Sequence, residues 1–223
     1  MNQNILEQDL NSIEQNMNDI VHASYDGTFM WKITDVQSKI NDAQLEEQTS
    51  IDSPSFYSSS TGYKMCLRIY LNGDRNERGK FISLFFILMR GEYDAILKFP
   101  FDFKITFCLY DQTDKKNHII DTFRPDINSN SFERSRSDIN IASGISSFAS
   151  LTLFQQQNSP YVRDDTIFIK VLVDFNDTPK DLLPYAFNLN AGLTSQIQSA
   201  KIRQEVEKPQ SSSASTTMNI VTD

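Results

Sequence analysis

The sequence of 223 residues contains no apolar run long enough to span a membrane, which takes about 18 residues. No Lys or Arg precedes Lys32, so the basic start of an ordinary secretory signal peptide is missing. The net charge of -8 leaves no basic face for neutralising phosphates. These absences argue against membrane insertion, secretion and nucleic-acid binding, and they predict a cytoplasmic protein.

Cysteine is scarce: the chain has two, Cys66 and Cys108. Each occupies an even position in a predicted strand whose odd positions are apolar, so the alternation directs both thiols outward. A disulfide between them is one alternative. Two reduced thiols in a cytosolic protein is the interpretation that we favour.

Catalytic and metal-binding patterns are also missing. The two histidines, His22 and His118, lie far apart in the sequence, and no glycine-rich loop suited to phosphate appears. Asp164 and Asp165 are adjacent, so a strand would direct them to opposite faces, and we predict a structural role in a loop. We therefore expect no enzyme activity, no catalytic residue, no metal and no cofactor.

The most informative segment runs from Gly62 to Gly91. Every odd position from Tyr63 to Leu71 is apolar, while the even positions include Arg68 and Tyr70. A period of two directs the first set into a core and the second set to an exposed face. Arg68 and Tyr70 therefore lie on one face, where a guanidinium and a phenol can bind the carboxylate of a partner.

The same segment predicts a β-hairpin and a central strand. Asn72-Gly73 is a strong signal for a tight turn, since both residues tolerate positive φ. The charged run 74–78 is expected at the solvated tip of the hairpin. The almost unbroken apolar run from Phe81 to Met89 is typical of a strand covered on both sides.

Period-two patterns extend over residues 25–175, which we assign to one β domain. Further strands are expected at 28–36, 103–110 and 166–174, and the polar stretch 37–49 is expected to be a loop or a short helix. Many short strands with little helical pattern between them indicate an antiparallel β-sandwich. The fold class is therefore all-β.

The two ends of the chain differ from this domain. Residues 1–24 carry a heptad pattern typical of a coiled coil, with Leu at a and Ile at d favouring trimers or tetramers over dimers, and a single amphipathic helix on the domain is the alternative. Residues 176–223 become rich in Ser, Gln and Thr, and we expect a mostly disordered tail with a brief helix near 202–206. The heptad positions are Leu6, Leu10, Ile13, Met17 and Ile20.

A second polar cluster, Ser129-Asn130-Ser131, lies between Phe123 and Phe132. Hydroxyls flanked by aromatic rings can hold an amide of an extended ligand, although an ordinary loop has the same composition. Five segments favour a binding role for this cluster through their family resemblance: DGTFMWKITD, SPSFYSSSTGYKMCLRIYLNGD, SLFFILMRGEYDAILKFPF, DTFRPDINSNSFERSRSDINIASG and YVRDDTIFIKVLVD. They resemble, in the right order, the C-terminal domain (TRAF/MATH domain) of the tumour necrosis factor receptor-associated factors, the TRAF family.

This resemblance covers about Asp26 to Asp174 and implies an eight-stranded antiparallel sandwich trimerised by the preceding coil. It implies a cytoplasmic signalling adaptor, a homotrimer or a heterotrimer with other family members. Each subunit would bind a Pro-x-Gln-x-Glu-like tail of a receptor or adaptor protein, extended in a shallow groove at the sheet edge.

Carried over by position, the resemblance also implies roles for individual residues. Arg68 and Tyr70 would bind the acidic residue of the peptide, and the hydroxyls of Ser129 and Ser131 would hold its Gln. Asp74 would contact the far end of the peptide, and Ser143 would hydrogen-bond beside the pocket for a small residue or Pro. That pocket would be lined by Phe85, Phe123, Phe132 and Gly144.

Two departures from the family pattern bear on function. Asn130 stands where close relatives have a serine, so selectivity for Gln is expected to be relaxed. Most family members place RING and zinc-finger regions before the coil, and this sequence does not contain them. The sequence leaves open whether the chain is a fragment or a short member. The alternative function is a MATH-type substrate-recognition module for a ubiquitin ligase, which would bind Ser/Thr-rich peptides.

Overall fold

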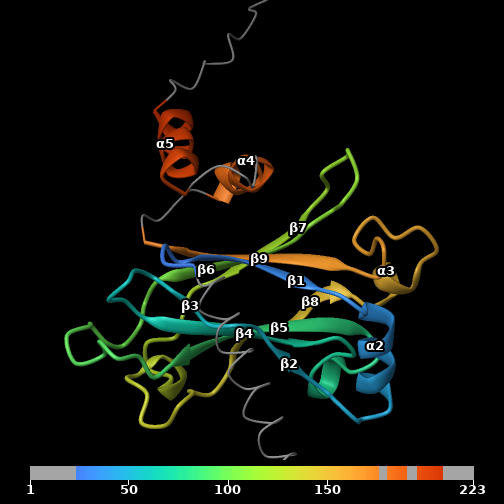
Figure 1. Ribbon diagram of the computed structural model, residues 1–223, viewed down its shortest axis with the longest axis horizontal. Coiled ribbons are helices and arrows are strands. Elements are labelled where there is room, and N and C mark those ends of the chain that lie inside the picture. The colour runs from blue at the N-terminus through green and yellow to red at the C-terminus, as the bar shows by residue number, and fades with distance from the viewer. Residues whose placement is uncertain (1–23, 176–179, 190–194, 208–223) are drawn as a thin grey trace, which may run out of the picture. The chain divides into compact units, whose positions relative to one another are not determined.

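Two antiparallel sheets face each other in the first of two units, Met1–Thr178, in the computed structural model (Figure 1). The structure describes residues 24–175, 180–189 and 195–207. One sheet has the order β1 (Thr28–Ile33), β9 (Ile167–Asp174), β6 (Lys104–Leu109) and β7 (Ile119–Phe123). The other has the order β2 (Ile51–Asp52), β4 (Lys64–Tyr70), β5 (Phe81–Met89) and β8 (Ser143–Ser150), with β3 (Phe56–Tyr57) also paired to β4.

The predicted eight-stranded antiparallel sandwich is confirmed. Strands β2 and β3 both pair with β4, on the side opposite β5, and they are separated by Ser53, Pro54 and Ser55. Pro54 has no N–H for a ladder bond, so the edge strand is interrupted there. The nine strands of the described residues therefore occupy eight positions in two sheets.

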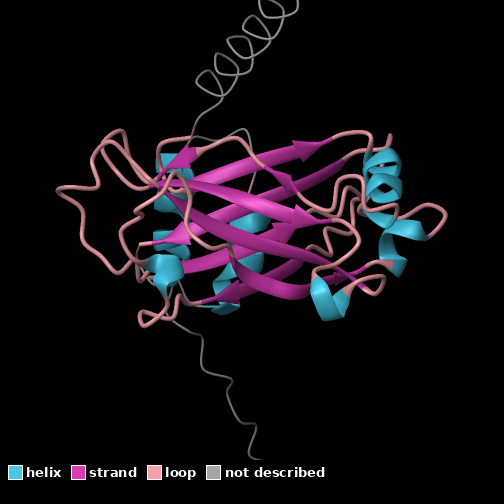
Figure 2. Ribbon diagram, turned by 90° about the horizontal axis from the view of Figure 1, so that it is seen from below, coloured by secondary structure: helices cyan, strands magenta, loops and turns pink. Residues whose placement is uncertain are grey.

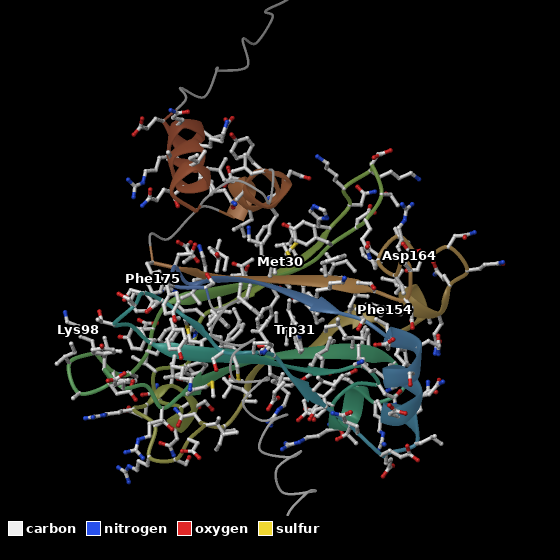
Figure 3. All side chains as sticks on the ribbon, in the orientation of Figure 1. Met30, Trp31, Lys98, Phe154, Asp164 and Phe175 are labelled. Carbon is white, nitrogen blue, oxygen red and sulfur yellow. The ribbon has the colours of Figure 1, made fainter. Side chains whose placement is uncertain are left out.

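The core lies between the sheets and is built from alternate residues of the strands. Figure 3 shows Trp31 between the two sheets and its neighbour Met30 on the other face of β1. Trp31 is 7% exposed and Met30 37%, as the period of two requires. The strands contribute the following core residues: Phe29, Trp31, Ile33, Phe56, Met65, Leu67, Ile69, Ile82, Leu84, Phe86, Leu88, Ile105, Phe107, Leu109, Phe148, Ala149, Ile167, Ile169, Val171 and Val173.

Helices and loops gather at the two ends of the sandwich (Figure 2). Helix α2 (Val36–Gln44) shows that a short helix, one of the two alternatives expected for the polar stretch, forms there, and Asp35, with a φ of 54°, ends the preceding extended run before it. Among the described residues of this unit, the other helical segments are η1 (Arg75–Glu77), η2 (Asn130–Phe132) and α3 (Thr152–Gln155).

The hairpin between β4 and β5 is confirmed, but the tight turn expected at Asn72-Gly73 is wrong. The connection runs over residues 71–80 and includes η1. Gly73 has a φ of 81°, which suits glycine, and the N–H of Gly79 donates to the carbonyl of Asn72 at 2.8 Å. The charged run lies in this longer connection, as predicted.

Both cysteines are free, as expected, but their predicted outward exposure is wrong. Cys66 is 3% exposed and Cys108 is 0% exposed. Ile87, the cross-strand partner of Cys66, is also buried, and η2 contacts β5. The outer face of the second sheet is thus covered by neighbouring segments near Cys66 and Ile87. The alternation of apolar residues along one strand cannot reveal that another segment covers its outer face.

The second unit, Pro179–Asp223, contains η3 (Lys180–Leu182), α4 (Leu183–Asn188) and α5 (Ser195–Val206) among its described residues. Helix α5 begins before the brief helix that we expected near 202–206. None of the described helices is long and apolar enough to cross a membrane. The five heptad residues Leu6, Leu10, Ile13, Met17 and Ile20 lie outside the described residues.

We expect Ile105→Ala to lower the free energy of unfolding by about 2–5 kcal/mol, because it leaves a cavity between the sheets. Ile96→Ala is the matched control: Ile105 is 0% exposed and Ile96 76%, so the control is expected to change stability by less than about 0.5 kcal/mol. Guanidinium denaturation curves measure both. Equal losses for the two variants would contradict this placement of the core.

Candidate functional site

A row of side chains crosses the second sheet at one level. Asp52 of β2 pairs with Arg68 of β4, Arg68 pairs with Phe85 of β5, and Phe85 pairs with Gly144 of β8. Cross-strand partners lie on the same face of an antiparallel sheet. Tyr70 is two residues from Arg68 and joins them on that face. We call Asp52, Arg68, Tyr70, Phe85 and Gly144 the Arg68 face.

Arg68 is held by a two-pronged ion pair with Asp52. Its Nε donates to Oδ1 of Asp52 and its Nη2 donates to Oδ2, both at 2.6 Å. The Arg68 side chain is 25% exposed and that of Asp52 is 42% exposed. The hydrogen bond to Asp52 raises the pKa of the Arg68 guanidinium, burial opposes this, and a hydrogen bond to Tyr70 adds to the rise.

Sequence reasoning missed Asp52. It belongs to a two-residue strand followed by Ser53 and Pro54, and nothing in such a short stretch identifies its partner. The pairing with Arg68 becomes visible once β2 is placed beside β4.

Tyr70 and Phe85 form an aromatic pair on this face. Their ring centroids are 5.6 Å apart and their planes meet at 78°, which is an edge-to-face contact. Across β5 the backbone of Gly144 approaches closely: a Cβ added there would lie 2.7 Å from the Cα of Phe85. Gly144 therefore leaves the space above Phe85 free of a side chain on the β8 side.

Asp74 lies just beyond β4, where the chain is fastened to the next two strands. The Asp74 N–H donates to Oγ of Ser83 at 2.9 Å, and that hydroxyl donates to the carbonyl of Ser146 at 2.5 Å. Ser83 is the cross-strand partner of Tyr70. The structure thus places Asp74 next to the end of the Arg68 face that Tyr70 occupies.

The polar cluster forms η2, a segment that contacts β5. Oγ of Ser129 accepts from the N–H of Ser131 at 3.3 Å, and Nδ2 of Asn140 donates to the carbonyl of Ser131 at 3.1 Å. Ser129 is half-buried, Asn130 is exposed, Ser131 is 7% exposed and Phe132 is 1% exposed. The Phe132 ring therefore anchors the segment in the core, and Asn130 presents the most accessible side chain of the three polar residues.

The two remaining predicted site residues, Phe123 and Ser143, do not lie on the Arg68 face. Phe123 lies on β7 in the other sheet, where its ring centroid is 5.7 Å from that of Phe107, although β7 and β8 are in contact. Ser143 pairs with Phe86, a core residue, so the pleat puts it on the opposite side of β8 from Gly144. The structure does not bring these two onto the Arg68 face.

The residues considered for catalysis have structural surroundings. Asp165 accepts the Gln37 N–H at Oδ1 (2.9 Å) and the Val36 N–H at its carbonyl (3.2 Å), so it satisfies donors at the start of α2. This is the structural role predicted for the Asp164-Asp165 loop, which Figure 3 marks at Asp164. Among the described residues, no group of three or more His, Cys, Asp or Glu is arranged to hold a metal ion.

The sheet order and the Arg68 face together define a class: an antiparallel sandwich with a charged and aromatic row across one sheet. The chain belongs to the TRAF/MATH family, because the family model "TRAF/meprin, MATH domain" matches residues 48–170. The family predicted from the sequence is confirmed.

Individual relatives agree with this assignment. The chain is 46% identical over 168 residues to TNF receptor-associated factor 1 of Mus musculus, covering 75% of this chain and 41% of that protein. It is 49% identical over 162 residues to TNF receptor-associated factor 2 of Homo sapiens, covering 73% and 32%. The chain thus spans less than half the length of these curated relatives.

A solved structure supports the fold. The chain of Notothenia coriiceps TRAF5 superposes with a TM-score of 0.72 at 35% sequence identity, covering 77% of this chain and 84% of that one. At this likeness the antiparallel sandwich is shared between the two proteins.

Burial raises the pKa of the Cys66 thiol from 9.0 to about 12 and raises that of Cys108 as well. We therefore expect neither thiol to react with Ellman's reagent at pH 8 in the native chain, and both to react in guanidinium. Because folding raises the pKa of the Cys66 thiol, the protonated thiol contributes its full share to the free energy of unfolding below about pH 9. This contribution is lost as the pH rises toward 12. Rapid labelling of the native chain would contradict the burial.

Proposed function

We propose that this chain is the recognition part of a cytoplasmic signalling adaptor that binds extended tails of TNF-receptor-type receptors or of adaptor proteins. The observation that carries the proposal is the Arg68 face, where strand register gathers a guanidinium, a phenol, an aromatic ring and a side-chain-free glycine. The names of the relatives, TNF receptor-associated factors, support the receptor class of partner.

The sheet edge supports an extended mode of binding. Strand β8 pairs with β5 on one side and ends the order of its sheet, so a peptide strand can add there. We propose that Phe85 and Gly144 receive a small residue or Pro of a Pro-x-Gln-x-Glu-like tail. Ser129 and Asn130 would then bind the Gln side chain, and Arg68 with Tyr70 the acidic residue.

Assembly would supply the strength that one exposed face lacks. The heptads at residues 6–20 support a trimer, and three faces engaging clustered tails would raise apparent affinity by about 10²- to 10⁴-fold without a new contact. The receptor would then be recognised by its clustering as well as by its sequence.

We expect Arg68→Ala to weaken binding of a labelled Pro-x-Gln-x-Glu peptide at least tenfold, because it removes the cation and leaves the Asp52 carboxylate facing the peptide acid. Fluorescence anisotropy measures the affinity, with Arg163→Ala as the matched control. Arg163 is exposed in the turn before β9, in the other sheet, and its replacement is expected to change nothing.

Two results would bear on the location of the site. A peptide in which Ala replaces Gln is expected to bind more weakly as well, since Ser129 and Asn130 lose their partner. If Arg68→Ala keeps full affinity while its circular dichroism and melting curve stay native, the peptide binds elsewhere.

For the trimer, we expect the pair Leu10→Lys and Met17→Lys to lower the assembled mass to that of one chain, 25.6 kDa, because charge at heptad core positions costs burial. The matched control adds the same charge one residue along, at Asn11 and Asn18. Sedimentation equilibrium measures both. An unaltered chain that already sediments as a monomer would end the proposal of a trimer by this segment.

A second candidate is a substrate-recognition module for a ubiquitin ligase that binds Ser/Thr-rich peptides. One observation favours it: Asp52 already neutralises Arg68, so the face does not require an acidic ligand. Stronger binding of a neutral Ser/Thr-rich peptide than of the Pro-x-Gln-x-Glu peptide would select this candidate.

A further inference from the structure

The ion pair between Arg68 and Asp52 leaves a defined set of donors. A guanidinium has five N–H groups: one on Nε and two on each terminal nitrogen. Asp52 takes Nε and one N–H of Nη2. The two N–H groups of Nη1 and the second of Nη2 are the ones beyond the reach of this two-pronged contact, and the hydrogen bond to Tyr70 draws on this remaining set.

A peptide carboxylate arriving at these donors meets a neutralised cation. It must either displace Asp52 or share Arg68 with it, and sharing brings two carboxylates around one guanidinium. Two like charges at such a short distance repel each other, whereas a neutral amide ligand meets no such repulsion. The Asp52 side chain is 42% exposed, so water screens part of this effect.

We propose that Asp52 is a specificity-determining residue of the recognition face: it competes with the acidic residue of the ligand for Arg68 and so lowers the preference for acidic over neutral peptides. This inference rests on the proposed function. It assigns a role to a residue outside the set that family resemblance implies, and it predicts that one face accepts tails with either Glu or Gln at that position.

The test compares two labelled peptides, Pro-x-Gln-x-Glu and Pro-x-Gln-x-Gln, on the unaltered chain and on Asp52→Asn. Asn keeps the shape and removes the charge. We expect the acidic peptide to gain about two- to fivefold in affinity in Asp52→Asn, the size of effect typical of partly exposed charge pairs. The neutral peptide is expected to change by less than twofold.

The matched control is Asp102→Asn. It removes the same charge from another exposed pair, in which Asp102 lies 3.7 Å from Arg124. If only net charge mattered, both variants would raise the affinity for the acidic peptide equally, and the role of Asp52 would be overturned.

Two further outcomes overturn the proposal. An unchanged ratio of the two affinities in Asp52→Asn means that Asp52 does not compete. Weaker binding of the acidic peptide in that variant means that Asp52 positions Arg68 for the ligand instead.

A measurement without ligand separates this inference from the proposed function. In the free chain, the ¹⁵N–¹H signal of the Arg68 Nε–H is expected to exchange slowly with water, and to exchange at least several-fold faster in Asp52→Asn. Equal exchange rates overturn the ion pair whatever the peptides do. A protected signal in a chain that binds neither peptide, in any variant, overturns the proposed function and with it the role of Asp52 in recognition.

Discussion

The register of β5 with its two neighbours is the constraint on which the candidate site depends. Phe85 faces Arg68 on one side and Gly144 on the other because β5 pairs with β4 and β8 in one alignment. A slip by one residue would exchange the two faces of the strand, sending Phe85 inward and Leu84 outward. The same pairing therefore builds both the core and the Arg68 face, and neither can be kept while the other is lost.

The outer side of β5 is only partly open, and this limits where the proposed ligand would bind. Ser83 and Ile87 are 0% exposed, whereas Phe85 between them is half-buried. Ser83 is covered because its hydroxyl accepts from the N–H of Asp74, in the connection that follows β4, and donates to the carbonyl of Ser146 in β8. It lies at the irregularity in the register between Ile82 and Leu84. Ile87 lies toward the end where η2 contacts the strand. Phe85 is thus an accessible apolar position between two closed ones.

Local patterns in the sequence predicted the parts of this arrangement that depend on one strand at a time. The alternation from Tyr63 to Leu71 was enough to assign Arg68 and Tyr70 to one face. Contacts between distant segments were beyond its reach: the cover over Cys66, the partner of Arg68 sixteen residues away, and Asp165 bound to the N–H of Gln37 across 128 residues. Family resemblance supplied Phe85 and Gly144, which periodicity would have left in a buried strand and a loop.

The use of arginine at position 68 is consistent with a site that serves two partners. A lysine ammonium is a single point charge, and a close carboxylate would occupy most of its field. A guanidinium can give one edge to Asp52 and keep donors on another, so the side chain is fixed in place before a ligand arrives. Fixing it lowers the entropy lost on binding, while neutralising it lowers the attraction for acid. In the proposed function, the balance of these opposing effects, rather than the presence of a cation alone, would determine which tails this face can distinguish.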